Sequence, residues 1–239
     1  MLITSLENKK VKEWTKLHNK KYRGEEFLLL NEEMVKEAKK HNLLKTLIYV
    51  GAKPFEHEES FEVTRDVMNK ISKKEDLEFI GIGLPIKEKK VFDSRVMILE
   101  DLQDPLNIGR VFENAYNFGF DSVILSNNSA DIYNEKCLEA AGVSFYLLNI
   151  CHEDIEEAIK ELKNNDFKVY ATGLKDYSLE LYDVKKENKM AFILGNEGSG
   201  VKESTFRISD EIIKIDMHNI DSLNVAMAGA IVMYRFANI

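Results

Sequence analysis

Three stretches of this 239-residue chain carry residue types that could hold a ligand or move a proton. In DPLNIG (104–109) a rigid proline leads into an Asn-x-Gly turn, and a helix that begins there directs free N–H groups outward. In LGNEGSG (194–200) three glycines permit close approach of the backbone to a ligand, and Glu197 suits a cationic ligand or proton transfer. In IDSLNVAMAGA (220–230), Ser222 can cap a helix whose next residues are small.

Each stretch by itself also has an ordinary structural explanation. DPLNIG could be an ordinary strand-to-helix turn, LGNEGSG a surface turn, and IDSLNVAMAGA a buried helix with a serine cap. LGNEGSG does not match the phosphate loop GxxxxGK[ST], because no Lys-Ser or Lys-Thr pair follows Gly200. Cys137 and Cys151 have no metal-ligand spacing and cannot form a disulfide framework, so we expect no metal site.

The elements that must position these stretches follow an alternating pattern. Short apolar strands alternate with amphipathic helices, which predicts an α/β fold with a mostly parallel sheet and a ligand crevice beyond the carboxyl ends of the strands. We expect strands at RVMILEDL (95–102) and at FYLLNI (145–150), and a helix from Ile108. The polar stretch PIKEKKVFDS (85–94) predicts a linker between two domains, 1–88 and 92–239.

The charge and the hydropathy of the chain limit which nucleic-acid and membrane partners it can have. The net charge of −8 argues against a chain that binds nucleic acid over its whole surface, yet residues 1–23 hold seven basic residues against two acidic ones, with Trp14 and Tyr22 among them. This segment predicts RNA contacts, and the alternative is a solvated amphipathic helix. The candidate RNA-binding residues are Lys9, Lys10, Lys12, Lys20, Lys21 and Arg23. No apolar run reaches the ~18 residues of a membrane span and the N-terminus lacks a secretory signal, so we expect a cytoplasmic protein without a membrane partner.

Taken together, the three stretches resemble a known family. DPLNIG…NFG, ILGNEGSG and IDSLNVAMAGAI, in this order and spacing, resemble the signature motifs of the SpoU (TrmH-like) RNA methyltransferases of the SPOUT class. ITSLENKKVKEWTKL…KKYR is similar to the ribosomal-protein-like substrate-binding domain of that family, which is a small α/β domain. The resemblance implies a homodimer whose C-terminal domain contains a trefoil knot. It also implies methyl transfer from S-adenosylmethionine to a ribose 2′-hydroxyl of ribosomal or transfer RNA.

The resemblance also assigns roles by position. The residues implied to lie at the cofactor are Leu194, Gly195, Ile215, Met217 and Leu223. The residues implied to serve the reacting ribose are Asn107, Glu197, Ser222 and Asn224. The small-residue helix after Ser222 would contribute to the dimer interface. Because the cofactor's sulfonium is itself the electrophile, the reaction needs no metal.

One position departs from the family pattern where it matters most. Six residues after the motif asparagine the family has an arginine, as general base or phosphate anchor, and this chain has Glu113. A second position that is basic in the family, within NEKCLEAAG, is occupied here by Glu139. In addition, FLLLNEEM stands where the family usually has phenylalanine followed by Val-Glu-Gly. Arg110 lies one turn before Glu113, so it could supply the charge or pair with the acid.

Three hypotheses therefore stay open. The first is an RNA 2′-O-methyltransferase in which Arg110 acts as a catalytic residue. The second is a non-catalytic SpoU-like RNA-binding or assembly protein, favoured by Glu113 and Glu139. The third is a methyltransferase with a different acceptor.

Overall fold

The computed structural model describes residues 2–218 and 223–237. The chain forms two compact units, one made of Met1–Lys87 with Asp131–Tyr146 and the other of Glu88–Ala130 with Leu147–Ile239. Residues 131–146, which we expected in the second domain, thus pack with the first unit. No helix in the described part of the chain is long and apolar enough to cross a membrane.

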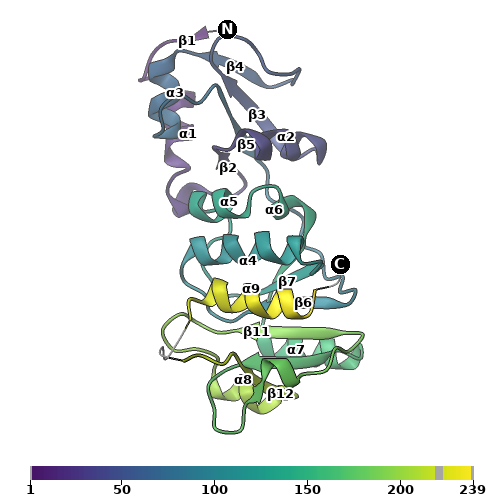
Figure 1. Ribbon diagram of the computed structural model, residues 1–239. Helices are drawn as coiled ribbons and strands as arrows, with labels where there is room; N and C mark the ends of the chain where they lie inside the picture. Colours follow the sequence, from purple (N-terminus) through teal and green to yellow (C-terminus); the bar gives the residue numbers. More distant parts are fainter. Residues whose placement is uncertain (1, 219–222, 238–239) are drawn as a thin grey trace. The chain divides into compact units, whose positions relative to one another are not determined.

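The first unit contains a five-stranded mixed sheet in the order β1-β4-β3-β5-β2 (Figure 1). Its strands are β1 (Leu2–Ile3), β2 (Phe27–Leu29), β3 (Leu44–Tyr49), β4 (Ser60–Val63) and β5 (Phe79–Gly83). Its helices are α1 (Lys9–Lys16), the 3-10 helix η1 (Lys20–Tyr22), α2 (Glu32–Lys40), α3 (Arg65–Ser72), α5 (Glu135–Ala141) and α6 (Ser144–Leu147). The side chain of Asn8 caps α1, and Val11 and Trp14, one turn apart, bury one face of that helix against the sheet.

Two ion pairs and one histidine–carboxylate contact hold residues 131–146 in the first unit. Arg23 pairs with Asp131 at 3.0 Å, His18 contacts the carboxylate of Glu135, and Lys74 contacts that of Glu139. The acid at Glu139, unexpected from the family pattern, therefore has a lysine partner in the same unit.

The strand expected at FYLLNI is wrong over its first four residues. Phe145 and Tyr146 lie in α6, and β8 begins only at Asn149. Both rings are buried although they are consecutive, with Phe145 against Phe27 and Tyr146 against His41. A strand would direct two consecutive side chains to opposite faces, whereas one turn of helix lets both pack into the unit.

The second unit contains a seven-stranded sheet in which every neighbouring pair is parallel, in the order β10-β12-β9-β11-β6-β7-β8. Its strands are β6 (Arg95–Leu99), β7 (Ser122–Ser126), β8 (Asn149–Glu153), β9 (Lys168–Thr172), β10 (Leu179–Glu180), β11 (Met190–Leu194) and β12 (Glu211–Lys214). Its helices are α4 (Pro105–Asn117), α7 (Ile155–Asn164), η2 (Leu181–Asp183), α8 (Glu203–Ile208) and α9 (Val225–Arg235). The predicted α/β class with mostly parallel strands is confirmed.

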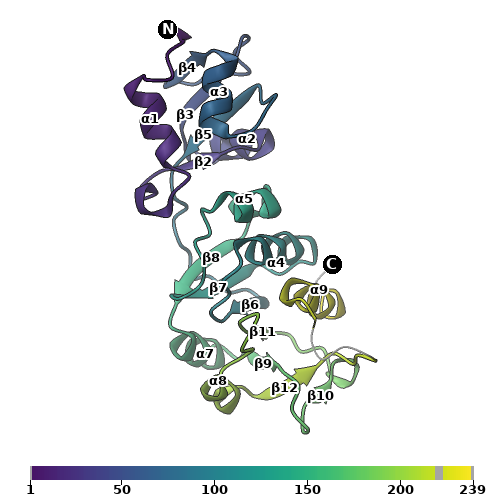
Figure 2. The same cartoon turned by 90° about the vertical axis from the view of Figure 1, so that its left-hand side faces the viewer.

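Two pairs of helices cover the faces of this sheet. In Figure 2, α4 and α9 lie on one side, and α7 and α8 on the other. The central strands β6, β7 and β11 are buried along their whole length, as expected for parallel strands covered on both faces. α4 begins at Pro105, earlier than the expected Ile108, because Asp104 caps it and proline suits the first helical position.

Candidate active site at the carboxyl ends of two central strands

The first two motifs begin side by side in the sheet. β6 and β11 are neighbours, and their register pairs Leu99 with Leu194 at the carboxyl ends of the two strands. Beyond this pair, the N–H of Glu100 donates to the carbonyl of Leu194 at 2.9 Å. The crevice beyond the carboxyl ends of parallel strands is the usual ligand position in such sheets, and both motifs open into it.

Glu197 of the second motif binds the turn formed by the first. Its carboxylate accepts hydrogen bonds from the backbone N–H groups of Gln103 and Asp104, both at 3.0 Å. The Nδ2 of Asn107 donates to the same carboxylate at 3.3 Å. Because Asn107 is itself buried, its amide is fixed in one orientation by this contact.

The third motif joins the same group through Asn224. This residue caps α9, accepting from the N–H of Ala226 at 3.0 Å, and its Nδ2 donates to the Oδ1 of Asn107 at 3.0 Å. Residues far apart in the sequence thus form one hydrogen-bonded chain, Glu197–Asn107–Asn224. Ser222, which we expected to cap this helix, lies outside the described residues, and the observed cap is Asn224.

The carboxylate of Glu197 is a poor proton acceptor in this arrangement. Burial raises its pKa, but the hydrogen bonds from Gln103, Asp104 and Asn107 lower it by more, so the pKa lies below its ordinary value. A carboxylate that already accepts three hydrogen bonds has little capacity to take a proton from a hydroxyl. The proton-transfer role suggested by the sequence is therefore disfavoured, and the structure points to positioning of Asn107.

The glycine-rich loop is a tight, internally bonded turn rather than a flexible one. Asn196 and Gly200 exchange backbone hydrogen bonds, and the Oδ1 of Asn196 accepts from the N–H groups of Gly198 and Ser199. A Cβ on Gly195 would lie 2.1 Å from the backbone carbon of Gly200. Glycine is therefore needed at position 195 by the closure of the loop itself.

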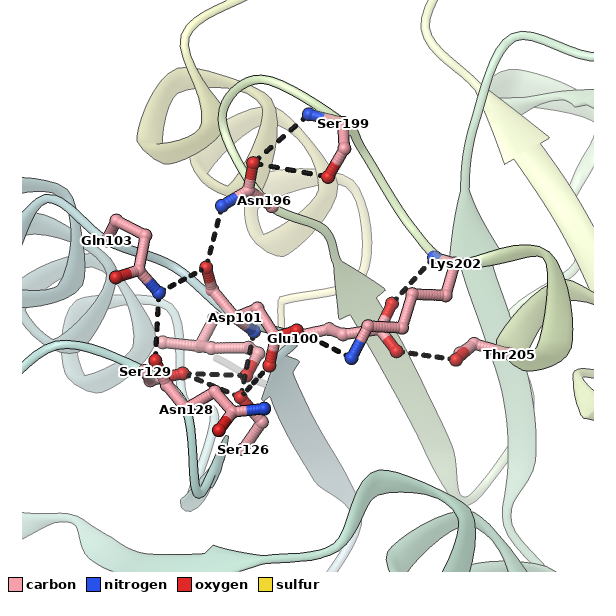
Figure 3. A network of polar contacts seen from close by, with 11 residues as sticks. Glu100, Asp101, Gln103, Ser126, Asn128, Ser129, Asn196, Ser199, Lys202 and Thr205 are labelled. Carbon is pink, nitrogen blue, oxygen red and sulfur yellow. Dashed lines mark hydrogen bonds and ion pairs between the residues drawn. The ribbon is translucent and has the colours of Figure 1, made fainter.

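A polar network anchors this loop to the sheet (Figure 3). The Nδ2 of Asn196 donates to the carbonyl of Asp101, whose side chain accepts from Ser126 and pairs with Lys202. The buried carboxylate of Glu100 accepts from the backbone N–H of Lys202 at 2.8 Å. These contacts fix both ends of the loop, which lets Glu197 hold a defined position.

Three of the five expected cofactor residues line one cavity. A hollow of about 140 Å³ lies beyond the ends of β9 and β12 and beside α9, with an almost entirely apolar lining. Its lining residues are Thr172, Gly173, Leu174, Ile213, Lys214, Ile215, Met217, Leu223, Ala228 and Val232. Leu194 and Gly195 do not line it. Leu194 is buried, and its side chain would lie 2.8 Å from a Cβ on Gly229, so it packs closely under α9.

Sequence reasoning missed the contribution of β9 to this cavity. Thr172 is the last residue of β9, and Gly173 and Leu174 follow it. The available signal was a glycine directly after a buried strand. Only the order of strands in the sheet, which places β9 between β11 and β12, shows that this strand end belongs to the site.

Comparison with known proteins decides the family. The model of the SpoU rRNA Methylase family matches residues 94–234. The 23S rRNA (guanosine(2553)-2'-O)-methyltransferase RlmP of Bacillus subtilis (strain 168) is 30% identical over 243 residues, which cover 98% of each chain. The chain belongs to the SpoU rRNA methylase family.

Two solved structures share the fold of nearly the whole chain. An AdoMet-bound rRNA methyltransferase from Sinorhizobium meliloti has a TM-score of 0.89 at 22% identity, covering 98% of this chain and 96% of that one. The SpoU methyltransferase AviRb from Streptomyces viridochromogenes, in complex with AdoMet, has a TM-score of 0.83 at 18% identity, covering 95% and 96%. At these identities the likeness concerns the fold alone.

In this SpoU protein, Arg110 and Glu113 do not neutralise one another. Both side chains are exposed on α4, and neither forms an ion pair with any residue in the described part of the chain. The alternative in which Arg110 merely pairs with Glu113 is therefore not observed. The guanidinium of Arg110 lies one helical turn beyond Asn107 and is accessible to a ligand.

The basic N-terminal segment divides into paired and unpaired residues. Lys9, Lys10 and Lys12 each have a glutamate partner, at 3.9, 3.6 and 2.5 Å. Lys20 and Lys21 have no such partner among the described residues. The side chain of Arg23 is only 5% exposed and pairs with Asp131, so Arg23 is unsuited to bind a phosphate and leaves the candidate RNA-binding set.

No group of three or more histidine, cysteine, aspartate or glutamate side chains that could hold a metal occurs among the residues described. Cys137 and Cys151 are both buried, and burial raises the pKa of the Cys151 thiol to about 12. A thiol held in its protonated form is a weak nucleophile and a weak metal ligand, so neither cysteine is a candidate for the chemistry.

Gly195 lies outside the cavity, but the family resemblance places its loop at the cofactor, so replacing Gly195 with alanine should open that loop and abolish cofactor binding. The new methyl group would collide with the backbone of Gly200 and Val201, both 2.1 Å away, and an overpacked site costs about 1–3 kcal/mol of folding free energy. Gly198→Ala is the matched control, because its Cβ meets only the Asn196 side chain at 3.5 Å. Melting temperature and calorimetric titration with S-adenosylmethionine measure the effect. A Gly195→Ala protein that keeps wild-type values for both would contradict it.

Proposed function

We propose that this SpoU protein transfers a methyl group from S-adenosylmethionine to a ribose 2′-hydroxyl of ribosomal or transfer RNA, with ribosomal RNA as the first candidate. The observation that carries the proposal is the meeting of all three motifs in the chain Glu197–Asn107–Asn224, beside an apolar cavity at the strand ends. Similarity to RlmP over 98% of both chains supports the choice of acceptor.

The cavity suits one part of the cofactor. Ligand pockets usually measure ~300–1,000 Å³, so a hollow of about 140 Å³ fits a flat ring system rather than the whole molecule. Its apolar wall, with Ile215, Met217 and Leu223 contributing, suits the adenine ring, and backbone groups at the strand ends would meet its polar edge. S-adenosylmethionine supplies an activated methyl group on its sulfonium when bound.

The residues of the motif chain would position the acceptor. Asn107 has its Oδ1 and Nδ2 engaged by Asn224 and Glu197, so it is preorganised to orient the ribose beside it. Arg110, one turn along α4, would hold the adjacent phosphate or stabilise the developing alkoxide. We propose these two as catalytic residues, with Glu197 and Asn224 positioning Asn107 and Ser222 retained as a candidate.

The non-catalytic alternative is not favoured. It rests on Glu113 and Glu139, yet Glu113 lies exposed on α4 and forms no hydrogen bond or ion pair with the described residues Asn107, Glu197 and Asn224. Glu139 is paired with Lys74 in the first unit. A protein that only bound RNA would have little need of the bonded motif chain and the apolar cavity together.

Methyl transfer from tritiated S-adenosylmethionine tests the function. Ribosomal RNA transcribed in vitro would be the acceptor, with a matched 2′-deoxy substitution at the labelled nucleotide as control. Incorporation that is lost in the 2′-deoxy RNA supports the proposal. Label that persists there would assign the methyl group to a base, and a failure to label any RNA would favour the non-catalytic alternative.

We also propose a homodimer formed through α4 and α9. On α9, Met227, Ile231 and Tyr234 follow helical spacing and are 58%, 38% and 72% exposed. Tyr116 is exposed on α4, the helix that packs against α9. An apolar stripe of this kind on a soluble domain is typical of an interface. The knotted arrangement implied by the family is proposed for the same C-terminal segment, supported by the position of β9 between β11 and β12.

Replacing Ile231 and Tyr234 together with aspartate should convert the dimer to a monomer. Two buried, unpaired carboxylates per subunit would be too costly at an apolar interface. Light scattering coupled to gel filtration measures the mass, and Tyr177→Asp, at a residue 69% exposed elsewhere in the unit, is the control. A wild-type protein that is monomeric, or a double variant that stays dimeric, would rule this interface out.

A further inference from the structure

The first unit contains a groove that none of the three motifs enters. It measures about 550 Å³ and is lined by residues of α1, of the segment that follows it and of the start of β3. Trp14 and Leu17, both buried, form part of its floor, and Tyr22, 44% exposed, stands at its rim. The volume lies within the ~300–1,000 Å³ of typical ligand sites, so a nucleotide-sized group can enter.

Unpaired lysines surround the exposed ring at the rim. The Nζ atoms of Lys21 and Lys16 lie 4.9 and 5.7 Å from the centroid of the Tyr22 ring. Together with Lys20, these lysines have no carboxylate partner in the part of the chain that the structure describes. Two free ammonium groups beside an exposed aromatic ring, with Lys20 adjacent in the chain, form a surface that can bind phosphates next to a stacked base.

The interior of the groove differs from its rim in charge, because its lysines are paired with glutamates. Lys10 is paired with Glu59 at 3.6 Å and Lys45 with Glu26, so both interior lysines are neutralised. Glu25 also lines the groove and has no ion-pair partner among the residues described. An interior with paired lysines and a free carboxylate disfavours a phosphate, but it accepts a neutral heterocycle that carries N–H donors.

We propose that this groove binds an unpaired nucleobase of the RNA substrate, stacked on Tyr22, with Lys16, Lys20 and Lys21 holding the adjoining phosphates. The inference rests on the proposed function for the identity of the ligand as RNA. Sequence-specific RNA recognition commonly uses unstacked bases on aromatic side chains. The Glu25 carboxylate accepts from amino groups, so the groove favours cytosine, adenine or guanine over uracil.

Trp14 makes the test direct, because it is the single tryptophan of the chain and lines the groove. The full-length protein would be titrated with single-stranded hexanucleotides of cytidine and of uridine while its fluorescence is recorded. We expect saturable quenching, tighter for cytidine. Tyr22→Ala should weaken binding roughly 5- to 100-fold through the lost stack, while Tyr22→Phe retains it. Tyr177→Ala is the control, and melting temperatures verify that each variant folds.

The rim lysines are tested by the salt dependence of the same titration. Lys20→Ala with Lys21→Ala should reduce the slope of log K against log salt by about 1.4, because each phosphate contact on a single strand contributes ~0.7. Lys185→Ala with Lys186→Ala removes the same charge in the second unit and should leave the slope unchanged.

The possible outcomes separate this inference from the proposed function. If neither hexanucleotide quenches Trp14, or if Tyr22→Ala binds as tightly as the wild type, the groove is not a base site, even if RNA is methylated. Quenching that depends on Tyr22, in a protein that methylates no RNA, would support the groove and overturn the proposed function.

Discussion

Replacing Arg110 with alanine is expected to reduce methyl transfer by at least about 10²–10³-fold, the loss seen when one preorganised donor is removed from a reacting oxygen. Arg110 lies one turn beyond Asn107 on α4, and its exposed guanidinium has no ion-pair partner among the described residues. Binding of S-adenosylmethionine should be unchanged, because the residue is not at the cavity. Turnover with tritiated S-adenosylmethionine and calorimetric binding together measure the two effects.

Two variants make this prediction specific. Arg207→Ala removes the same charge from an exposed site on α8 and should leave turnover unchanged. Glu113→Arg places a guanidinium where the family usually has one, so it should restore activity to the Arg110→Ala protein. Unchanged activity in Arg110→Ala alone would show that Arg110 does not replace the missing arginine.

The second large effect is expected from Glu197→Gln. An amide cannot accept from the N–H groups of Gln103 and Asp104 with both of its atoms, so at least one charge-assisted hydrogen bond, worth about 1.5–3 kcal/mol, is lost. The turn before α4 should loosen, and Asn107 should lose its fixed orientation. We expect kcat to fall about 10²-fold while the affinity for S-adenosylmethionine changes little.

A pH profile distinguishes positioning from proton transfer at Glu197. Its pKa is lowered in the folded protein, so the stability it provides is present above the ordinary glutamate pKa of about 4.3 and is lost as pH falls through the lower, folded value. Its ionisation should therefore make no contribution to kcat between about pH 6 and 9. Glu203→Gln, at an exposed carboxylate paired with Lys175, is the control. A kinetic pKa in the neutral range that disappears in Glu197→Gln would contradict a positioning role.

Much of the site could be predicted from the sequence, because functional residues of parallel sheets lie in the segments after the carboxyl ends of the strands. Buried apolar strands are visible in the sequence, and the segments that carry Asn107 and Glu197 follow two of them. Their meeting therefore depends on β6 and β11 being neighbours. The resemblance supplied Asn224 and three of the cavity residues. The identity of the cap on α9 was wrong, because serine and asparagine both suit that position and the contact of Asn224 with Asn107 is not visible in the sequence.

The features that the sequence did not predict depend on contacts between distant residues. Arg23 stands in a basic run that suggests RNA binding, but it is buried against Asp131, 108 positions away. The same ion pair, with the contacts that Glu135 and Glu139 make to His18 and Lys74, holds residues 131–146 in the first unit. Hydrophobic periodicity shows which face of an element is buried but not which residues cover it. The burial of Arg23 and the packing of residues 131–146 in the first unit could therefore not be predicted from the sequence pattern.

Calorimetric titration with S-adenosylmethionine, repeated with S-adenosylhomocysteine, is the most direct measurement of the central claim, because it requires no knowledge of the RNA. We predict micromolar binding at one site per subunit by both compounds, lost in Gly195→Ala and retained in Gly198→Ala. An absence of binding by either compound to the folded wild-type protein would contradict the methyltransferase account, and would identify Glu113 as the mark of a family member that has lost its chemistry.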